Sequence, residues 1–446
     1  MGGSTRRGGA AAGAGGGAEG GGGGRGAAAA NASTFPTAAQ VYRAQADLYT
    51  AVRAPLKAAE ALRRWLGARA ASASATLADA VEAHAAIATD LREAGRWSEA
   101  LEMLDRAAGV GELGPEATAI LAKLQASVYA CKGEAATALS LYESAKKMRV
   151  LAGLAPYDDP VPDALQHIDL LRRAATVDPP PPPGVAARLN AAADRIVDGL
   201  LRTGPWRLRD QLPRRYVPGL AARPWHDVDT HFPALAPARD VMVAAAPALA
   251  REYNSLRRRR LLERESECIH DAARGDWKQY AVNGYWHVRD DAGCAVDTPA
   301  ACALLATLRA LPGAPLIVLR AGYSMVEGTA HLHPHFGMTN AQLKFHIGLV
   351  TPLTPAGDPC ATMRVANETR GWRAGEVWLF DDSFEHEVVN ACDRPRAIMQ
   401  VVIAHPDYSP TTATGVAPPP QTPDSSSAAR AGPPQRLLPH STGAGH

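Results

Sequence analysis

Three histidines at alternate positions, in the stretch HLHPHFG (331–337), are the first residues whose types and spacing could bind a metal ion. In an extended strand, alternate residues share a face with Cα atoms about 6.6 Å apart, which places His331 and His335 about 13 Å apart. One ion therefore cannot bind all three, although His331 with His333 or His333 with His335 could bind it. Pro334 disturbs a regular strand, so the stretch alone does not choose between these pairs or exclude histidines that only pack.

A second candidate pair follows in EVWLFDDSFEHEVVN and RPRAIMQVVIAH, where His386 and Arg396 open two predicted strands. Both residues are at even positions, so they face the same interior if the intervening turn preserves parity. A buried guanidinium without an anionic partner is very costly, so an anionic ligand is expected. A small dicarboxylate could chelate a metal at one end and meet Arg396 at the other. That describes 2-oxoglutarate at a non-haem iron, whose usual site has two histidines and one carboxylate.

The elements that must position these residues change along the 446-residue chain. Early segments carry apolar residues at helical spacing, whereas after about residue 277 short β-branched and aromatic runs are separated by turn residues. The pattern predicts an α+β multidomain protein, in which a helical-repeat region precedes a double-stranded β-helix (jelly roll) with flanking helices. The predicted parts are a disordered Gly/Ala-rich segment (1–34), the helical region (35–176), a Pro-rich linker (177–189), the β-rich domain (190–408) and a disordered Pro/Ser-rich tail (409–446).

Two segments of the helical region look like copies of each other, AGRWSEALEMLDRA (94–107) and CKGEAATALSLYESA (131–145). Setting Gly95 on Gly133 aligns several small and apolar residues at an offset of 38 residues. Small residues let antiparallel helices approach closely, as in stacked helical hairpins. The region resembles tetratricopeptide repeats, although their usual period is 34 residues, and an ordinary helical bundle is the alternative.

Composition limits the possible partners and compartments. The chain has 47 basic and 45 acidic residues, a net charge of +2, which gives no excess for binding nucleic acid or anionic membranes. No apolar run is long enough for a membrane span, because Arg309 and Pro312 interrupt the best candidate. Six cysteines without a CxxC pair predict packing or surface thiols rather than a disulfide framework or a zinc ribbon. Cys294 and Cys302 could form a disulfide in an oxidising compartment.

The motifs PHxG, NETxxW and FDDSFEHEV, together with LPRRYVPGLAARPWHD and AHPD, resemble the catalytic domain of the aspartyl/asparaginyl β-hydroxylase family over about residues 190–408. The resemblance implies that Fe(II) is bound by His335 of PHxG and His386 of FEHEV, with His331 and His333 as wall or rim residues. Gly337 stands where most iron oxygenases carry a carboxylate, and the family is likewise known for a two-histidine site.

The resemblance also implies the residues that bind the cosubstrate and the substrate. Arg396 and Ser324 would hold the distal carboxylate of 2-oxoglutarate, and His346 would lie near its keto-acid end. Gln342, Lys344 and His346 alternate on one predicted strand, and the first two replace arginines of the animal hydroxylases. The expected cosubstrate-binding set is Ser324, Lys344, His346 and Arg396, and the expected substrate-binding set is Trp277, Gln279, Gln342 and Asp382. An acidic turn selects Asp for its own hydrogen bonds, so Asp381 and Asp382 need no catalytic role.

The resemblance predicts a dioxygenase that uses Fe(II), 2-oxoglutarate and O2 to hydroxylate aspartyl or asparaginyl residues in peptides or proteins. The alternatives are hydroxylation of a free amino acid or a lipid acyl chain, or an inactive helical-repeat scaffold that only binds partners. Helical repeats favour a peptide or protein substrate, because a stacked concave surface is a common peptide platform. The cytoplasm is the default compartment, and the endoplasmic reticulum is an alternative implied by the animal members, which a membrane anchor holds there.

Overall fold

The protein is described by a computed structural model that covers residues 38–51, 54–70, 76–157, 159–177, 179–265, 267–270, 275–283, 294, 296–312 and 316–408. The segments predicted to be disordered, 1–34 and 409–446, lie outside the described residues. The described residues all belong to one compact unit. None of the described helices is both long enough and apolar enough to cross a membrane.

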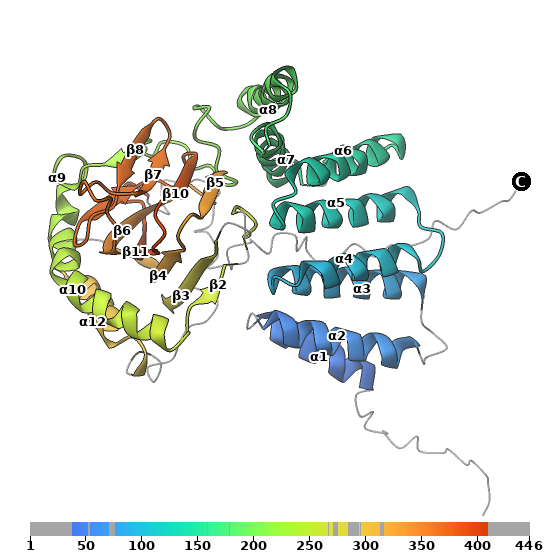
Figure 1. The fold of residues 1–446 in the computed structure, drawn as a ribbon, viewed down its shortest axis with the longest axis horizontal. Coiled ribbons are helices and arrows are strands. Elements are labelled where there is room, and N and C mark those ends of the chain that lie inside the picture. Colours follow the sequence, from blue (N-terminus) through green and yellow to red (C-terminus); the bar gives the residue numbers. More distant parts are fainter. Residues whose placement is uncertain are drawn as a thin grey trace, which may run out of the picture. The chain divides into compact units, whose positions relative to one another are not determined.

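Eight helices follow one another through the first half of the described chain, and each packs against the next (Figure 1). They are α1 (Ala38–Ala51), α2 (Pro55–Ala70), α3 (Leu77–Glu93), α4 (Trp97–Ala108), α5 (Pro115–Cys131), α6 (Ala135–Leu151), α7 (Pro160–Ala175) and α8 (Pro183–Thr203). Helix α8 begins inside the predicted linker and runs past residue 190, because proline is well tolerated in the first turn of a helix. The predicted end of the linker at residue 189 therefore lies inside a helix, whereas its predicted start at residue 177 follows the end of α7.

The offset of 38 residues recurs in the backbone of the helical region. Gly95 and Gly133 both adopt positive φ angles, 74° and 83°, directly after α3 and α5. In both turns the amide after the glycine donates to a carbonyl five residues earlier, the bond that closes a Schellman motif. Ala100 and Ala138, which the offset aligns, are both fully buried. These turns fit a repeat of helix pairs, and the tetratricopeptide assignment stays a prediction.

The second half of the chain contains two antiparallel sheets. Their strands are β1 (Trp225–His226), β2 (Glu263–Arg264), β3 (Trp277–Asn283), β4 (Val318–Val326), β5 (His331–His335), β6 (Gln342–Val350), β7 (Ala361–Val365), β8 (Glu368–Gly371), β9 (Val377–Phe380), β10 (His386–Asn390) and β11 (Arg396–Ala404). The larger sheet has the order β1-β9-β6-β11-β4-β3-β2, and the smaller has the order β5-β10-β7-β8. The chain is thus a mixed helix and sheet protein, as the sequence predicted.

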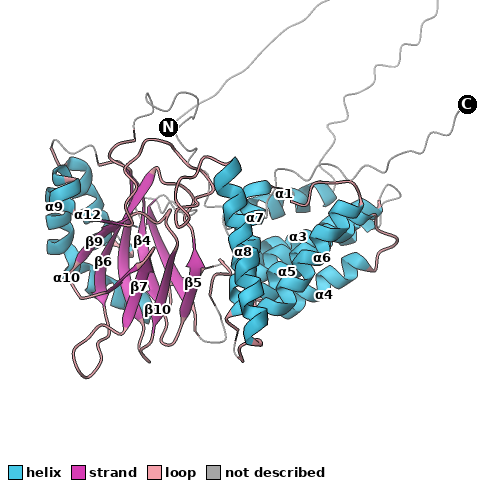
Figure 2. Cartoon of the chain, turned by 90° about the horizontal axis from the view of Figure 1, so that it is seen from above, coloured by secondary structure: helices cyan, strands magenta, loops and turns pink. Residues whose placement is uncertain are grey.

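The two faces of the larger sheet bury different cores. One face packs against α10 (Ala236–Arg258) and α12 (Pro299–Ala310), which Figure 2 shows together with α9 (Val228–His231) on one side of the strands. Along β11, Met399 and Val401 join that core, whereas Ile398 joins the core between the sheets. Arg396 has the same parity as Ile398, so it begins β11 on the face that meets the smaller sheet.

All six cysteines are paired in the structure. The disulfides are Cys131–Cys268, Cys294–Cys302 and Cys360–Cys392, with Cα–Cα distances of 4.5, 5.8 and 5.6 Å. The prediction of unpaired thiols is therefore wrong, although the pairing considered for Cys294 and Cys302 is present. Two of the bridges join residues 137 and 32 positions apart, and such pairs leave no local pattern in the sequence.

We expect Gly133→Ala to lower the free energy of unfolding by about 1–2 kcal/mol, because a residue with a Cβ atom pays this cost in the left-handed region. Gly109→Ala is the matched control, since Gly109 ends α4 with a φ of −85° and a Cβ atom there would make only ordinary contacts. The control should change stability by no more than about 0.5 kcal/mol. Urea unfolding followed by circular dichroism would measure both, and equal stabilities would contradict the left-handed turn.

Candidate metal and cosubstrate site

His335 and His386 face each other across two paired strands. They are register partners on β5 and β10, and their ring centroids are 4.1 Å apart. His335 Nδ1 donates to the carbonyl of His333 at 2.7 Å, and His386 Nδ1 donates to the carbonyl of Phe384 at 2.9 Å. A carbonyl only accepts, so Nδ1 carries the hydrogen in both rings and Nε2 keeps its lone pair. The pair therefore presents two nitrogen ligands to one place.

The protonation state of both rings suits metal binding. Burial lowers the pKa of His335, and burial together with the neighbouring His335 lowers the pKa of His386 well below its usual range. Both imidazoles are thus neutral at neutral pH, and neutral imidazole is the form that binds metals.

The three alternate histidines of HLHPHFG do not all share a face, because β5 contains a bulge. His335 pairs with His386, but the next pairing joins Val388 to Leu332, so β5 has one residue more than β10 in this interval. Leu332 points into the core between the sheets, and the His331 and His333 rings, 4.7 Å apart, lie on the opposite side. The shared face expected of a regular strand therefore holds for His331 and His333 but not for His335, because the bulge accommodates Pro334, which lacks an amide hydrogen.

Arg396 lies 2% exposed between the sheets, with its guanidinium carbon 4.2 Å from the centre of the Trp372 ring. Its Nε and Nη1 atoms have no hydrogen-bond partner among the described residues, and the same holds for Nε1 of Trp372 and Nδ1 of His346. Burial lowers the pKa of Arg396 to about 9, so the group remains charged at neutral pH. A buried cation with unused donors requires an anionic ligand.

Ser324 lies on β4, which pairs with β11. Its register partner on β11 is Ile398, and its hydroxyl accepts a hydrogen bond from Trp277 Nε1 at 3.0 Å. The hydroxyl hydrogen is therefore available for an anion. Gln279 is the register partner of Ser324 on β3. The structure thus brings Trp277 and Gln279 to Ser324, and their predicted contact with substrate stays a prediction.

Lys344 is already paired with a carboxylate. Its Nζ lies 2.7 Å from Oδ2 of the buried Asp382, while Gln342 Nε2 lies 3.4 Å from Oδ1. Burial raises the pKa of Asp382, but the positive charge of Lys344 and the nearby His386 outweigh it, so the pKa lies below its usual range. Lys344, Gln342 and His346 share β6 and one face of it. An anion bound at Lys344 would compete with Asp382.

Position 337, two residues after His335, has no room for the carboxylate side chain that common iron sites carry there. A Cβ atom at Gly337 would overlap the Asp382 carboxylate and its backbone oxygen. The Gly337 amide donates to that backbone oxygen at 2.7 Å. Within the described ranges no three His, Cys, Asp or Glu residues form a metal-binding group. The donor set is therefore two imidazoles, which fits a metal completed by a chelating cosubstrate and water.

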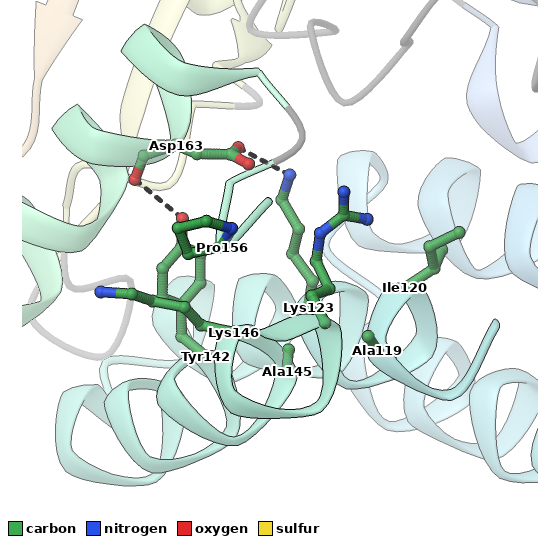
Figure 3. Close-up of a pocket in the computed structure, with 9 residues that line it drawn as sticks. Ala119, Ile120, Lys123, Tyr142, Ala145, Lys146, Pro156 and Asp163 are labelled. Atoms are coloured by element: carbon green, nitrogen blue, oxygen red, sulfur yellow. Dashed lines mark hydrogen bonds and ion pairs between the residues drawn. The ribbon is translucent and has the colours of Figure 1, made fainter. Parts of the chain in front are cut away.

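A separate hollow lies among α5, α6 and the first turn of α7 (Figure 3). Asp163 lines one side of it. Its carboxylate pairs with Lys123 Nζ at 2.6 Å, and its backbone carbonyl accepts a hydrogen bond from the Tyr142 hydroxyl at 2.7 Å. None of the predicted site residues lines this hollow. We assign it no role in the chemistry of His335 and His386.

Residues 244–406 match the sequence profile of the family described as Aspartyl/Asparaginyl beta-hydroxylase. These residues are similar to the aspartyl/asparaginyl β-hydroxylase family, as the motifs predicted. The mouse aspartyl/asparaginyl beta-hydroxylase is 36% identical over 137 residues, which are 31% of this chain and 17% of the mouse protein. An ornithine lipid ester-linked acyl 2-hydroxylase from Rhizobium tropici is 34% identical over 105 residues, 24% of this chain and 35% of that protein.

The chain therefore spans well under half the length of these relatives. Among solved structures, a prolyl-4-hydroxylase from Pseudomonas putida matches 39% of this chain and 89% of its own at 16% identity, with a TM-score of 0.26, too low for an argument. The family match begins inside α10 and does not include helices α1–α8.

Sequence reasoning missed two features of the β-rich part of the chain. Trp372 ends the motif NETRGW, which was noted without a role, yet its ring covers Arg396 and stacks on Trp378 at 5.2 Å. Gln211 donates to Asp381 Oδ2 at 3.1 Å and joins a distant segment to the turn before β10. The first could have been found from the motif, whereas nothing near Gln211 in the sequence indicates its partner.

Asp381 should make stability depend on pH. It is fully buried, and burial raises its pKa to about 8, against 3.8 for an ordinary aspartate. Between about pH 4 and pH 8 the unfolded chain has lost this proton and the folded chain keeps it, so stability from this group falls as pH rises. Asp381→Asn cannot ionise, so relative to the parent it should be more stable at pH 8 than at pH 5.

Unfolding in urea at pH 5 and pH 8 would measure this difference. The control is Asp358→Asn at an exposed turn, which should shift both values equally. If Asp381→Asn and the parent lose the same stability between the two pH values, the carboxyl group is not neutral in the folded state.

Proposed function

We propose that this chain is an Fe(II)- and 2-oxoglutarate-dependent dioxygenase that hydroxylates aspartyl or asparaginyl residues in peptides or proteins. The observation that carries the proposal is the buried guanidinium of Arg396, which has unused donors and lies in the same interior as two neutral imidazoles. The imidazoles can bind a metal, and the guanidinium can bind an anion. A chelating dicarboxylate satisfies both at once.

In this proposal each residue has a stated task. Nε2 of His335 and Nε2 of His386 bind the metal, and Arg396 with the Ser324 hydroxyl binds the distal carboxylate of 2-oxoglutarate. His346 lies within electrostatic reach of Arg396 and His386, and burial with the charge of Arg396 lowers its pKa well below its usual range. It therefore stays neutral between the two binding groups. Bound Fe(II) and 2-oxoglutarate supply the oxidation of a C–H bond by O2, with succinate and CO2 as coproducts.

Aromatic side chains keep the proposed cosubstrate pocket dry and rigid. Trp372 is buried under Arg396, and Trp378 stacks on it with an interplanar angle of 23°. Phe380 contacts both His346 and His386, with ring centroids 4.7 and 6.2 Å away. Stacked rings leave the guanidinium few orientations, which fixes the direction of its donors before an anion arrives.

The strand order supports a double-stranded β-helix for the proposed catalytic domain. Strands β4, β11, β6 and β9 are neighbours in one sheet, and β5, β10, β7 and β8 are neighbours in the other. The chain therefore passes repeatedly between facing sheets, which is the wiring of a jelly roll. The paired helices α1–α8 support a tetratricopeptide-like region beside it, with Schellman turns repeated at one offset.

Three observations bear on the proposed substrate class. The mouse relative is named for aspartyl and asparaginyl residues, whereas the Rhizobium tropici relative is named for a lipid acyl chain. Gln342 carries no charge for an acidic side chain, and Lys344 is paired with Asp382. The helical region favours a peptide or protein, because stacked helix pairs commonly bind extended peptides. Hydroxylation of a free amino acid or of a lipid acyl chain is the alternative.

His386→Ala should abolish the formation of succinate from 2-oxoglutarate in iron-loaded protein, because one of the two protein ligands is lost. His331→Ala is the matched control, since His331 lies on the opposite side of the same strand pair and contacts Glu387 instead. Succinate would be measured by mass spectrometry, with a pool of Asp- and Asn-containing peptides and, separately, ornithine lipid. A mass gain of one oxygen in the peptides supports the proposal, and unchanged turnover in His386→Ala would falsify the ligand assignment.

Arg396→Lys should raise the KM for 2-oxoglutarate about 10- to 100-fold, because lysine keeps the charge but loses the fork that grips a carboxylate. Arg394→Lys is the control, at an exposed position two residues earlier on the same turn. Steady-state kinetics with 2-oxoglutarate as the varied reactant would separate KM from kcat. A KM equal to that of the control would place the carboxylate elsewhere.

A further inference from the structure

The disulfide Cys131–Cys268 connects the helical region to a segment that pairs with the strand carrying His335. Cys131 is the last residue of α5, and Cys268 lies in the segment 267–270, which pairs with β5. The amide of His333 donates to the carbonyl of Ile269 at 2.6 Å, and His270 forms an antiparallel bridge with Leu332. The bridge therefore holds a segment that is itself hydrogen-bonded to the ligand-bearing strand.

Arg173 of α7 reinforces the same junction. Its side chain is 4% exposed, and its Nη1 atom donates to the carbonyl of Cys268 at 2.8 Å. Its Nη2 atom donates to the carbonyl of Ala130 at 2.7 Å, which is one of the last carbonyls of α5. One guanidinium thus spans the backbone on both sides of the disulfide. A planar fork can do this, whereas a single ammonium cannot bind both carbonyls with the same geometry.

Helix α7 reaches both proposed metal ligands through their chain neighbours. It contacts β5, which Figure 2 shows beside α7 and α8. Phe336, the residue after His335, packs against the core formed by α5, α6, α7 and α8. Arg172 pairs with Glu385, the residue before His386. The position of α7 is therefore coupled to the backbone on either side of the two-histidine pair.

We propose that Cys131, Cys268 and Arg173 are positioning residues, which fix α7 against the two ligand-bearing strands. Hydroxylation of the substrate, coupled to the conversion of 2-oxoglutarate to succinate, then requires the oxidised chain. Only the expected effect on hydroxylation rests on the proposed function. Three disulfides in one chain are typical of proteins made in oxidising compartments. The proposal therefore places the protein in such a compartment, in place of the cytoplasm that was the default expectation.

Reduction of the bridge can be written as a balanced step. A dithiol such as dithiothreitol gives two electrons and two protons, which convert the Cys131–Cys268 bond into two thiols, while the reductant closes into its own disulfide. The junction then depends on Arg173 and on the packing of Phe336. The bridge closes a loop of 137 residues, so its loss releases much of the chain entropy that it restrained.

Cys131→Ser/Cys268→Ser tests the proposal against Cys360→Ser/Cys392→Ser. The control removes a bridge between the far ends of β7 and β10, where no residue of the helical region takes part. Hydrogen exchange in α7, β5 and β11 would be followed in both variants and in the parent. Peptide mapping of the non-reduced parent would establish which cysteines are joined.

In Cys131→Ser/Cys268→Ser we expect amides of β5 and α7 to exchange about 30-fold or more faster than in the parent, with β11 unchanged. Arg173→Lys should shift the same amides in the same direction by a smaller factor, and Arg172→Lys should shift them less. The control should leave β5 and α7 as in the parent. Formation of succinate from 2-oxoglutarate without hydroxylation of a peptide should persist, while hydroxylation of the peptide pool should fall about 10-fold or more.

Two results would overturn the proposal. Free thiols at Cys131 and Cys268 in protein secreted from an oxidising compartment would remove its basis. Equal exchange of β5 and α7 in parent, control and Cys131→Ser/Cys268→Ser would show that the bridge positions nothing. If the double variant does not fold, graded reduction of the parent gives the same exchange comparison. The exchange result stands even if no peptide is hydroxylated, so failure of the proposed function is distinguishable.

Discussion

A guanidinium buried between two sheets loses its hydration, and the fold must offset that cost with contacts arranged in advance. For Arg396 these contacts are the Trp372 ring and the Trp378 ring stacked behind it. None of them is an anion, so the fold stabilises the cation only in part. The two-histidine pair lies on the opposite sheet, so an anionic ligand that binds Arg396 is held next to the two imidazoles.

Local patterns in the sequence were sufficient to predict the elements whose residues repeat at a short spacing. The helices, the alternation along β6 and the pairing of glycine turns at one offset all depend on residues within a few turns or one strand. His386 and Arg396 also converge as predicted, but for another reason. They lie on facing sheets rather than on two strands of one sheet, so parity through the turn does not decide their meeting.

The features that sequence reasoning could not supply depend on contacts between distant segments. The bulge of β5 becomes visible only from the register with β10, which turns His335 inward and leaves His331 outward. The ion pair of Lys344 with Asp382 joins β6 to the turn before β10, and it changes the charge expected at the pocket. Gln211 reaches Asp381 across 170 positions. Each of these is a long-range choice among many partners of the same chemical type, so composition and periodicity do not identify it.

The bridge from α5 to the segment before β3 means that the two halves of this chain are not separable modules. Cutting the protein at a boundary before residue 190 would leave five of its six cysteines in the β-rich piece, an odd number, with Cys268 as the thiol that has lost its partner. The same cut would expose Phe336, directly beside a proposed metal ligand. The β-rich half of the chain would then carry both an unpaired thiol and an exposed apolar side chain, so the shortened protein would not represent the whole.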